Sequence, residues 1–523
     1  MNSIKKLTYI LYFIGNFMML TYPGIFWDDW TLYNMSEKGI MNQFYGNGLF
    51  IAGYLHIFLQ KLIYPPLLYH LSTIILQLFS IFILFKIVDK YKNKNSIFLY
   101  FAILIYSVLP LFDAKITMIV LPYTLCLTLF ITATYFLIIF KFERTFIFKI
   151  LSLILFFISF FTTSLVFFYL IPLLLIIFYD DLRYIIDHKI KKLKVVFNIL
   201  INTLISHIDF ILLPVIFWIV KILYFSPSFQ YKESNYNEIN LESFLEIPYR
   251  LIISIYLFFI TLYPLLMELI QNLEFIILFI ILSGFIFLKL GRLDLNFKST
   301  KTKFLIGLLV CFIGLFPYIL VGKYPTFTGY SSRHQLLLGF GISLLVVDLI
   351  FYISSKRLRN LILAMSLGLF VILNISIQFN YFKGFMKQAV VNDYLESQNL
   401  SRDFSQTILY KDNTSNFTHK GNPSNFYELS GILKLSHPDE NIMLIKNEDF
   451  ILYLQDGTFK KLTPYFFSYN LSNYNLVNPG LELEISYSKK PLPSFPLFVY
   501  YGDYLSGNKE KWMKYFEFNL KVL

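Results

Sequence analysis

Long apolar runs separated by short polar stretches fill the first 380 residues of the chain. A helix needs about 20 mostly apolar residues to cross a membrane. Runs of this kind predict about eleven membrane spans, at 7–22, 66–86, 97–111, 118–140, 146–161, 162–179, 195–224, 272–290, 304–321, 334–354 and 360–380. We therefore expect a mostly α-helical, polytopic transmembrane bundle.

Two apolar stretches do not have the pattern of an ordinary membrane-spanning helix. Residues 49–63 are interrupted by His56 and Lys61, which is typical of an amphipathic helix lying on the membrane surface. Residues 249–268 are long enough to cross, but a second crossing would place the basic residues that follow 272–290 outside the cell. We therefore expect 249–268 to be partly re-entrant or to lie along the interface.

The pattern changes at about residue 384, where long apolar runs end and polar residues become frequent. The short apolar runs at 441–446 and 450–454 have the length of β-strands. The chain is thus expected to consist of a transmembrane domain at 1–383 and a small extracytoplasmic α/β domain at 384–523, which has a usual domain size.

Composition supports the membrane assignment. The chain is 56% hydrophobic and 15% charged, with a mean hydropathy of +0.60, whereas soluble proteins are about a quarter charged. The net charge of +12 comes from basic residues in short loops between apolar runs, a pattern typical of membrane topology rather than of nucleic-acid binding. Cys126 and Cys311 both lie in apolar runs, which excludes a disulfide framework or a zinc site built from cysteines.

The most informative polar feature is the acidic pair Asp28 and Asp29, just after the first apolar run. Lys5 and Lys6 precede that run, so the positive-inside rule predicts a cytoplasmic N-terminus and an acidic pair on the outer face. Charge is costly in lipid, and a tryptophan on each side of the pair favours the interface. We expect both carboxylates at the level of the lipid headgroups, facing water or a lipid-borne substrate.

Adjacent residues on a loop point in different directions, so one aspartate suits a general base while the other holds the loop or a metal. A carboxyl group near apolar surface or a second acid has a raised pKa, which suits proton transfer near neutral pH. The alternative is structural: one of the pair caps a helix that begins at Trp30.

Further charged residues are expected on the same face. Arg333 and His334 open a late span, and Lys323 lies in the preceding loop. An arginine side chain can bind phosphate through two N–H groups at once, which suits Arg333 to a phosphate site. The alternative is structural, because an arginine at the interface also extends toward lipid headgroups. Asp113 and Lys115 sit in a tight loop, as a second acid or substrate contact or simply as a pair. His56 is a further candidate contact, with ordinary amphipathic packing as its alternative.

This arrangement resembles the GT-C superfamily, integral membrane glycosyltransferases that use lipid-phosphate-linked sugars. Asp28-Asp29 matches the family's external acidic motif, and 49–63 resembles the interfacial helix that follows it. Arg333-His334 is similar to the Arg-Tyr that opens a late span in many bacterial members, with His as a departure, and Asp113 stands where some members carry a second acid. The resemblance covers residues 1–380.

The resemblance implies an enzyme of a bacterial or archaeal plasma membrane that moves a sugar from a polyprenyl-phosphate donor to a hydroxyl group of a cell-surface glycan, lipid or protein. Asp28, or Asp29 in its place, would take the proton of the acceptor, and Arg333 would stabilise the departing phosphate, with inversion at the sugar. The donor bond carries the driving force, so no cofactor is required, while a divalent metal at the acidic pair stays open. Partners are then the lipid-linked donor, the acceptor and membrane lipids, and no nucleic acid.

Three other functions fit parts of the pattern. A polysaccharide polymerase or ligase would rely on external arginines instead of the acidic pair. A lipid-glycan transporter or flippase would carry charges deep in its spans and two symmetric halves, and the sequence shows few such charges and no repeat. A scaffold with an external binding domain would give the acidic pair no role.

Overall fold

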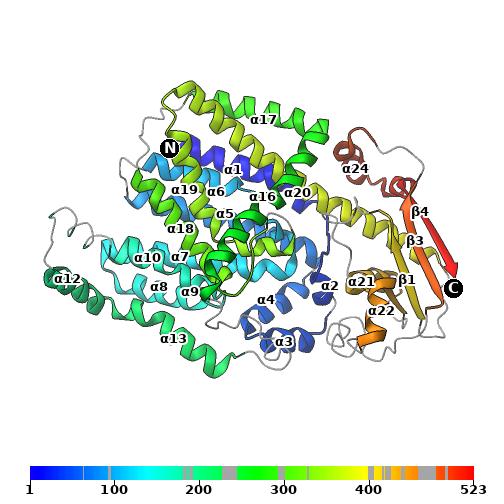
Figure 1. The fold of residues 1–523 in the computed structure, drawn as a ribbon, viewed down its shortest axis with the longest axis horizontal. Coiled ribbons are helices and arrows are strands. Elements are labelled where there is room, and N and C mark those ends of the chain that lie inside the picture. The colour runs from blue at the N-terminus through cyan, green and yellow to red at the C-terminus, as the bar shows by residue number, and fades with distance from the viewer. Residues whose placement is uncertain are drawn as a thin grey trace.

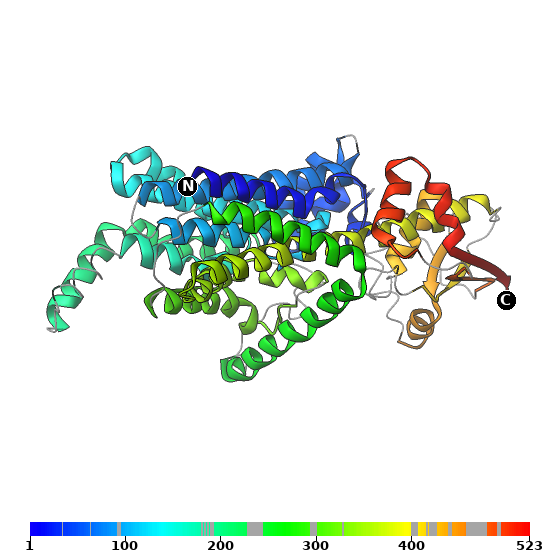
Figure 2. The ribbon, with the colours of Figure 1, turned by 90° about the horizontal axis from the view of Figure 1, so that it is seen from above.

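The computed structural model describes residues 1–33, 35–62, 64–91, 96–178, 181, 185, 188, 193–226, 244–292, 301–326, 329–398, 406–414, 417, 426–437, 442–456, 479–488 and 493–523. Helices form an elongated bundle, and a small β-sheet lies beyond the end that is farther from the N-terminus (Figures 1 and 2). The chain is therefore a mostly α-helical membrane protein with a small sheet near its C-terminus.

Within the described residues, six helices are long and apolar enough to cross a membrane. They are α5 (Pro65–Tyr91), α7 (Leu121–Glu143), α16 (Ile247–Gln271), α17 (Leu273–Gly291), α18 (Lys301–Leu320) and α20 (Lys356–Ser397). The pair α12 (Leu193–Ser206) and α13 (Ile208–Tyr224), bent by 65°, makes a seventh if it is one broken span.

The expected count of about eleven spans is not confirmed, because several predicted spans form helices shorter than a crossing requires. These are α1 (Asn2–Asn16), α6 (Ser96–Val108), α8 (Phe146–Ser159), α19 (Leu338–Phe351), and the run from α9 (Ser164–Phe168) through α10 (Leu170–Pro172) to the π-helix η4 (Leu173–Ile177). The predicted surface helix is α4 (Phe50–Gln60), which has 11 residues.

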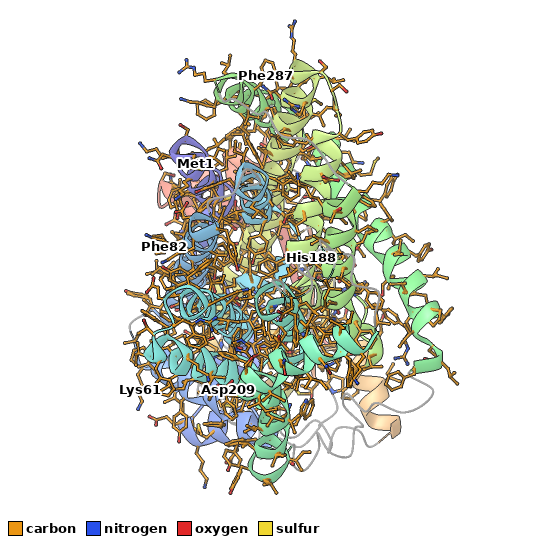
Figure 3. The ribbon with its side chains drawn as sticks, turned by 90° about the vertical axis from the view of Figure 1, so that its left-hand side faces the viewer. Met1, Lys61, Phe82, His188, Asp209 and Phe287 are labelled. Atoms are coloured by element: carbon orange, nitrogen blue, oxygen red, sulfur yellow. The ribbon has the colours of Figure 1, made fainter. Side chains whose placement is uncertain are left out.

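Large apolar side chains cover the outside of the bundle. On α5, Ile75, Phe79 and Phe82 are about half exposed, and Figure 3 shows Phe82 and Phe287 on the outer surface. A soluble monomer rarely exposes contiguous apolar patches of this kind, so this surface suits lipid.

The region 249–290 bears on the prediction that 249–268 is partly re-entrant or lies along the membrane interface. Residues 247–271 form one unbroken helix of 25 residues, and the chain breaks only at Asn272 before α17 begins. A re-entrant loop would need a break inside this stretch, so the re-entrant alternative is wrong, while placement along the interface stays a prediction. Only 12% of the apolar window of α16 is buried in the protein, so this helix lies at the edge of the bundle.

The helix α20 holds the segment that connects α1 to the acidic pair. The Gln378 side chain accepts a hydrogen bond from the Met19 backbone N–H at 3.1 Å, and the Tyr22 hydroxyl donates to the Gln378 carbonyl at 3.1 Å. Because α20 is buried along most of its length, these contacts anchor the segment around Asp28 and Asp29, which we call the acidic loop, to the core.

Beyond the bundle, four strands form a sheet in the order β2-β1-β3-β4: β1 (Gln406–Asp412), β2 (Ile442–Lys446), β3 (Leu481–Tyr487) and β4 (Phe516–Val522). The first three are parallel and β4 is antiparallel to β3. The helix α21 (Phe426–Ser436) connects β1 to β2. The strand expected at 441–446 is confirmed as β2, whereas 450–454 lies in the helix α22 (Asn447–Asp456), so that prediction was wrong.

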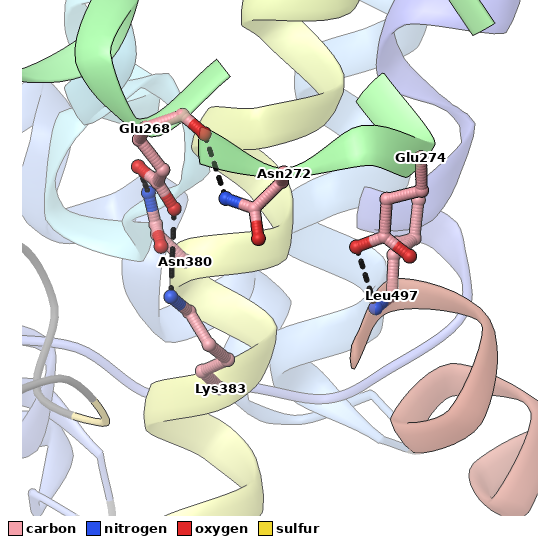
Figure 4. A network of polar contacts seen from close by, with 6 residues as sticks. All are labelled: Glu268, Asn272, Glu274, Asn380, Lys383 and Leu497. Carbon is pink, nitrogen blue, oxygen red and sulfur yellow. Dashed lines mark hydrogen bonds and ion pairs between the residues drawn. The ribbon is translucent and has the colours of Figure 1, made fainter. Parts of the chain in front are cut away.

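A continuous helix and several polar contacts connect the sheet region to the bundle. The helix α20 continues unbroken through residue 383, where the sequence predicts a domain boundary, to Ser397. Beside it, the Glu268 carboxylate accepts from Asn380 at 2.7 Å and lies 3.5 Å from the Lys383 ammonium (Figure 4). Glu274 accepts from the Leu497 N–H, at the start of α24 (Pro496–Leu505), at 2.9 Å (Figure 4).

Candidate functional site

The acidic pair lies at the end of the bundle nearest the sheet, where α2 (Asp29–Leu32) forms a single turn. Trp27 has a left-handed backbone, with φ of 51°, a conformation that bulky residues adopt only when their surroundings impose it. The turn gives the two carboxylates different environments. Asp28, at the N-cap position, is half-buried, whereas Asp29 is fully buried.

Asp29 is held by backbone donors. Its Oδ2 accepts from Met118 N–H at 2.9 Å and from Phe26 N–H at 3.4 Å, and its Oδ1 accepts from Ile119 N–H at 2.9 Å. Burial raises its pKa to about 8, against the lowering effect of these hydrogen bonds. The expectation that both carboxylates face water or lipid headgroups is therefore wrong for Asp29. Trp30, which was expected to face the membrane interface, is 1% exposed and lies inside the protein.

Two further loops are joined to each other by hydrogen bonds. Asp113, in η2 (Asp113–Ile116), accepts from the Gly329 N–H at 2.8 Å. Ser332, in η5 (Tyr330–Gln335), accepts from the Ala114 N–H at 2.7 Å. Asp113 is 2% exposed, so it holds the η5 loop instead of standing open to solvent.

Arg333 is connected to the acidic loop through aromatic rings. Its guanidinium carbon lies 3.6 Å from the centre of the Tyr330 ring. The Trp27 ring contacts the same Tyr330 ring edge-on, with the ring centres 5.6 Å apart. Trp27 directly precedes Asp28, so the arginine and the half-buried aspartate belong to loops that touch. Arg333 itself is half-buried.

His334 does not add positive charge to this group. Its side chain is 7% exposed and packs against the Tyr318 ring at 5.3 Å. Burial, with smaller effects of Arg333 and Lys323, lowers its pKa to about 3, so the imidazole is neutral at physiological pH. Lys323 is half-buried and near enough to influence His334, which leaves Arg333 and Lys323 as the cations of this loop.

Lys115 faces the interior of the bundle. It lies 3.4 Å from Asn374 Oδ1 and lines a cavity of about 60 Å³ with Tyr12, Gln77 and Gln335. Burial lowers its pKa to about 8, and the nearby Asp113 opposes that shift. Lys115 and Asp113 therefore each have a partner besides one another.

His56 belongs to the packing of α4 rather than to an open site. It is fully buried, its Nδ1 is 2.8 Å from the Tyr69 hydroxyl, and its ring lies 4.6 Å from that of Phe44. Burial lowers its pKa to about 3. A neutral, enclosed imidazole fits the structural alternative.

Sequence reasoning missed Glu428. This residue comes from α21 near the sheet, is 8% exposed, and interacts electrostatically with Asp28 and Asp29. Burial raises its pKa to about 8, and the charge of Asp28 adds to the shift. No sequence signal marks it, because 400 residues separate it from Asp28.

Across the described ranges, no group of three His, Cys, Asp or Glu residues is arranged to hold a metal ion. Asp28, Asp29 and Glu428 are therefore neighbours without forming a metal-binding triad.

Comparison with known proteins adds nothing to this geometry. No protein-family model matches this chain. A search of curated proteins also finds no match.

Proposed function

We propose that the protein is a membrane glycosyltransferase that moves a sugar from a polyprenyl-phosphate-type lipid to a hydroxyl group of a glycan, lipid or protein. The observation that carries the proposal is that a half-buried carboxylate, Asp28, and a half-buried guanidinium, Arg333, lie on two loops that touch at one end of an apolar bundle through the contact of Trp27 with Tyr330. An acceptor base and a phosphate clamp must both reach one sugar phosphate.

In this proposal Asp28 is the base. The oxygens of Asp29 are occupied by three backbone N–H groups, which suits that residue to holding the loop. Asp28 removes the proton of the acceptor hydroxyl as its oxygen forms a bond to the anomeric carbon. The bond from that carbon to the lipid phosphate breaks, its electron pair stays on the phosphate oxygen, and the sugar inverts.

Arg333 meets the charge that develops on the leaving phosphate. A guanidinium keeps its charge and offers a rigid fork to two phosphate oxygens. Stacking on Tyr330 holds its plane, which reduces the reorganisation needed in the transition state. Lys323 supplies a second positive charge from the same loop.

The first test replaces Asp28 with Asn in the full-length protein. Purified protein is offered polyprenyl-linked sugars, and release of the free lipid phosphate is measured. Loss of the base is expected to lower the rate by about 100-fold or more. Because Asp28 is half-buried, the variant should still purify as a folded protein.

The matched control is Glu510→Gln, which removes an exposed carboxylate from η10 (Lys509–Tyr515) and should leave the rate unchanged. Asp28→Asn protein with the parent's rate would contradict the assignment of the base. If the parent protein releases lipid phosphate from none of the donors, the proposal that it is a glycosyltransferase is contradicted.

A further inference from the structure

The helix α24, in the sheet region, is apolar on two opposite faces. One face is turned into the protein, where Leu497 is 6% and Tyr500 is 1% exposed. The other face carries Phe498 and Leu505, which are seven residues apart and 56% and 64% exposed. Gly502 lies between these two on the same face, with no atom within 4 Å of an added Cβ. A helix that is apolar all round is normally enclosed by protein or by lipid, so this outer face calls for a cover.

The start of α24 lies at the level where the candidate span α17 begins. With 19 residues, α17 rises by about 29 Å, close to the thickness of a hydrocarbon layer of about 30 Å. Its last turn carries Lys289, and its second residue is Glu274. The Glu274 carboxylate accepts from the Leu497 N–H at 2.9 Å (Figure 4). The first turn of α24 is therefore at the edge of the hydrocarbon layer on the sheet side.

Exposed apolar side chains of the bundle reach the same edge. Leu273, the first residue of α17, is 54% exposed, Ile277 is 43% exposed one turn later, and Ile270 at the end of α16 is 60% exposed. Phe498 directly follows Leu497, which is bonded to Glu274. The outer face of α24 thus begins where the lipid-facing surface of the bundle ends, which favours lipid over water as its cover.

The segment after α24 carries an excess of positive charge. In η10, Lys509, Lys511 and Lys514 are exposed, against one exposed carboxylate, Glu510. The Lys509 ammonium lies 5.3 Å from the centre of the Tyr504 ring, and Tyr504 is next to Leu505. Lys511 also lies 3.5 Å from the Asp503 carboxylate. Apolar side chains followed by exposed lysines match a lipid surface, with its acyl chains below and its phosphate groups above.

We propose that α24 is an interfacial helix that rests on the membrane. Phe498 and Leu505 lie at the boundary of headgroups and acyl chains in the leaflet on the sheet side, and the lysines of η10 contact lipid phosphate groups. The sheet region is then held against the bilayer at a second place, besides its connection through α20. This role does not depend on the proposed enzymatic function.

The experiment measures where the outer face of α24 lies in the bilayer. Spin labels are attached to Phe498→Cys and Leu505→Cys in full-length protein without Cys126 and Cys311. Each nanodisc holds one copy of the protein in a mixture of phosphatidylglycerol and phosphatidylcholine. Collision of the label with oxygen, which concentrates in lipid, is compared with its collision with a water-soluble nickel chelate.

Two exposed positions serve as references for this measurement. Ile281→Cys lies half-way along α17 and is the lipid reference, whereas Val522→Cys, on β4, is the water reference. The oxygen-to-nickel ratio at 498 and 505 should exceed that at 522 by about fivefold, because the apolar face of an interfacial helix is immersed at the acyl boundary. Ratios equal to that at 522 would overturn the proposal. Low collision with both reagents would show a cover made of protein and would overturn it as well.

The lysines are tested with the label at position 505. In the parent background, its oxygen-to-nickel ratio should be about twofold higher in nanodiscs with phosphatidylglycerol than in nanodiscs of phosphatidylcholine alone, because anionic lipid attracts the lysines. The triple variant Lys509→Gln, Lys511→Gln and Lys514→Gln should lose this difference. Equal ratios in the two lipids for the parent, or an unchanged difference in the triple variant, would overturn the contact of η10 with lipid phosphate.

Discussion

At the scale of the residue, neighbouring aspartates have different surroundings. Asp29 is enclosed and receives three backbone N–H groups, while Asp28 is half-buried. The division follows from one turn of helix, since consecutive side chains in α2 point in directions about 100° apart. In the proposed function, proton transfer and loop support are thereby assigned to different residues of one dipeptide.

Asp29→Asn is expected to destabilise the fold by about 1–3 kcal/mol, because an amide nitrogen would face a backbone N–H that now has an acceptor. Thermal unfolding of the purified variant measures this loss. Because burial raises the pKa of Asp29 to about 8, the parent loses stability as the pH rises from about 4 to about 8. The Asp29→Asn variant should lose less stability over that pH range. A variant with the same pH dependence of stability as the parent would contradict the assignment of this titration to Asp29.

Arg333→Lys is expected to slow lipid-phosphate release about tenfold and Arg333→Ala about 100-fold, because lysine keeps the charge but not the fork or the stacking on Tyr330. Steady-state rates at saturating donor measure the effect. The control is Arg357→Ala, an exposed arginine in the first turn of α20. Equal rates for Arg333→Lys and the parent would exclude a need for the fork.

At the scale of the element, the site depends on short irregular segments held by longer helices. The turn α2 and the segments η2 and η5 have four to six residues each. Such pieces have little helical stability of their own. Hydrogen bonds from backbone N–H groups therefore decide where the candidate residues lie. Asp29 accepts from Met118 and Ile119, and Asp113 and Ser332 tie η2 to η5.

Gly431→Ala tests the packing of α21 on α2. Alanine normally favours a helix over glycine, but here its methyl group would collide with Trp30. We expect a loss of about 1–3 kcal/mol in stability, measured by denaturant unfolding of the full chain. Gly502→Ala in α24, where nothing lies within 4 Å of the added atom, is the matched control and should be neutral or stabilising. A stabilised Gly431→Ala protein would contradict the contact.

Sequence patterns located the long helices because apolar length alone defines them, as at 65–91 and 301–320. They failed at 450–454, where five apolar residues suit a helix or a strand equally well. Burial of Asp29 and His56 was also beyond the sequence, since it depends on neighbours from distant segments. Glu428 could not be found for the same reason.

At the scale of the whole molecule, the bundle and the sheet lie along one long axis, with the C-terminus at the sheet end and the N-terminus in the part of the bundle away from the sheet (Figures 1 and 2). Hydrophobic packing runs without interruption from α1 through α20 to the strands. The C-terminal region is therefore part of the same body as the acidic loop.

The long axis predicts that Lys6 and Lys509 lie on opposite sides of the membrane. Both are exposed, and cysteines placed there should react with a membrane-impermeant maleimide from opposite faces of intact cells. A variant without Cys126 and Cys311 serves as background. Labelling of both positions from one face would contradict an arrangement in which the axis crosses the bilayer.

The helix α20 has 42 residues, so it is a rod of about 63 Å, roughly twice the thickness of the hydrocarbon layer. Its first half lies in the bundle, and its second half contacts the sheet, where Lys387 pairs with Asp412 of β1 and Tyr394 stacks on Phe518 of β4. Because continuous packing joins this rod to both parts, a tilt of the rod carries the acidic loop and α21 with it as one body. A thinner bilayer, which favours tilted helices, would thus change the angle at which the whole site meets the lipid headgroups, and lipid chain length becomes a means of adjusting donor access from a distance.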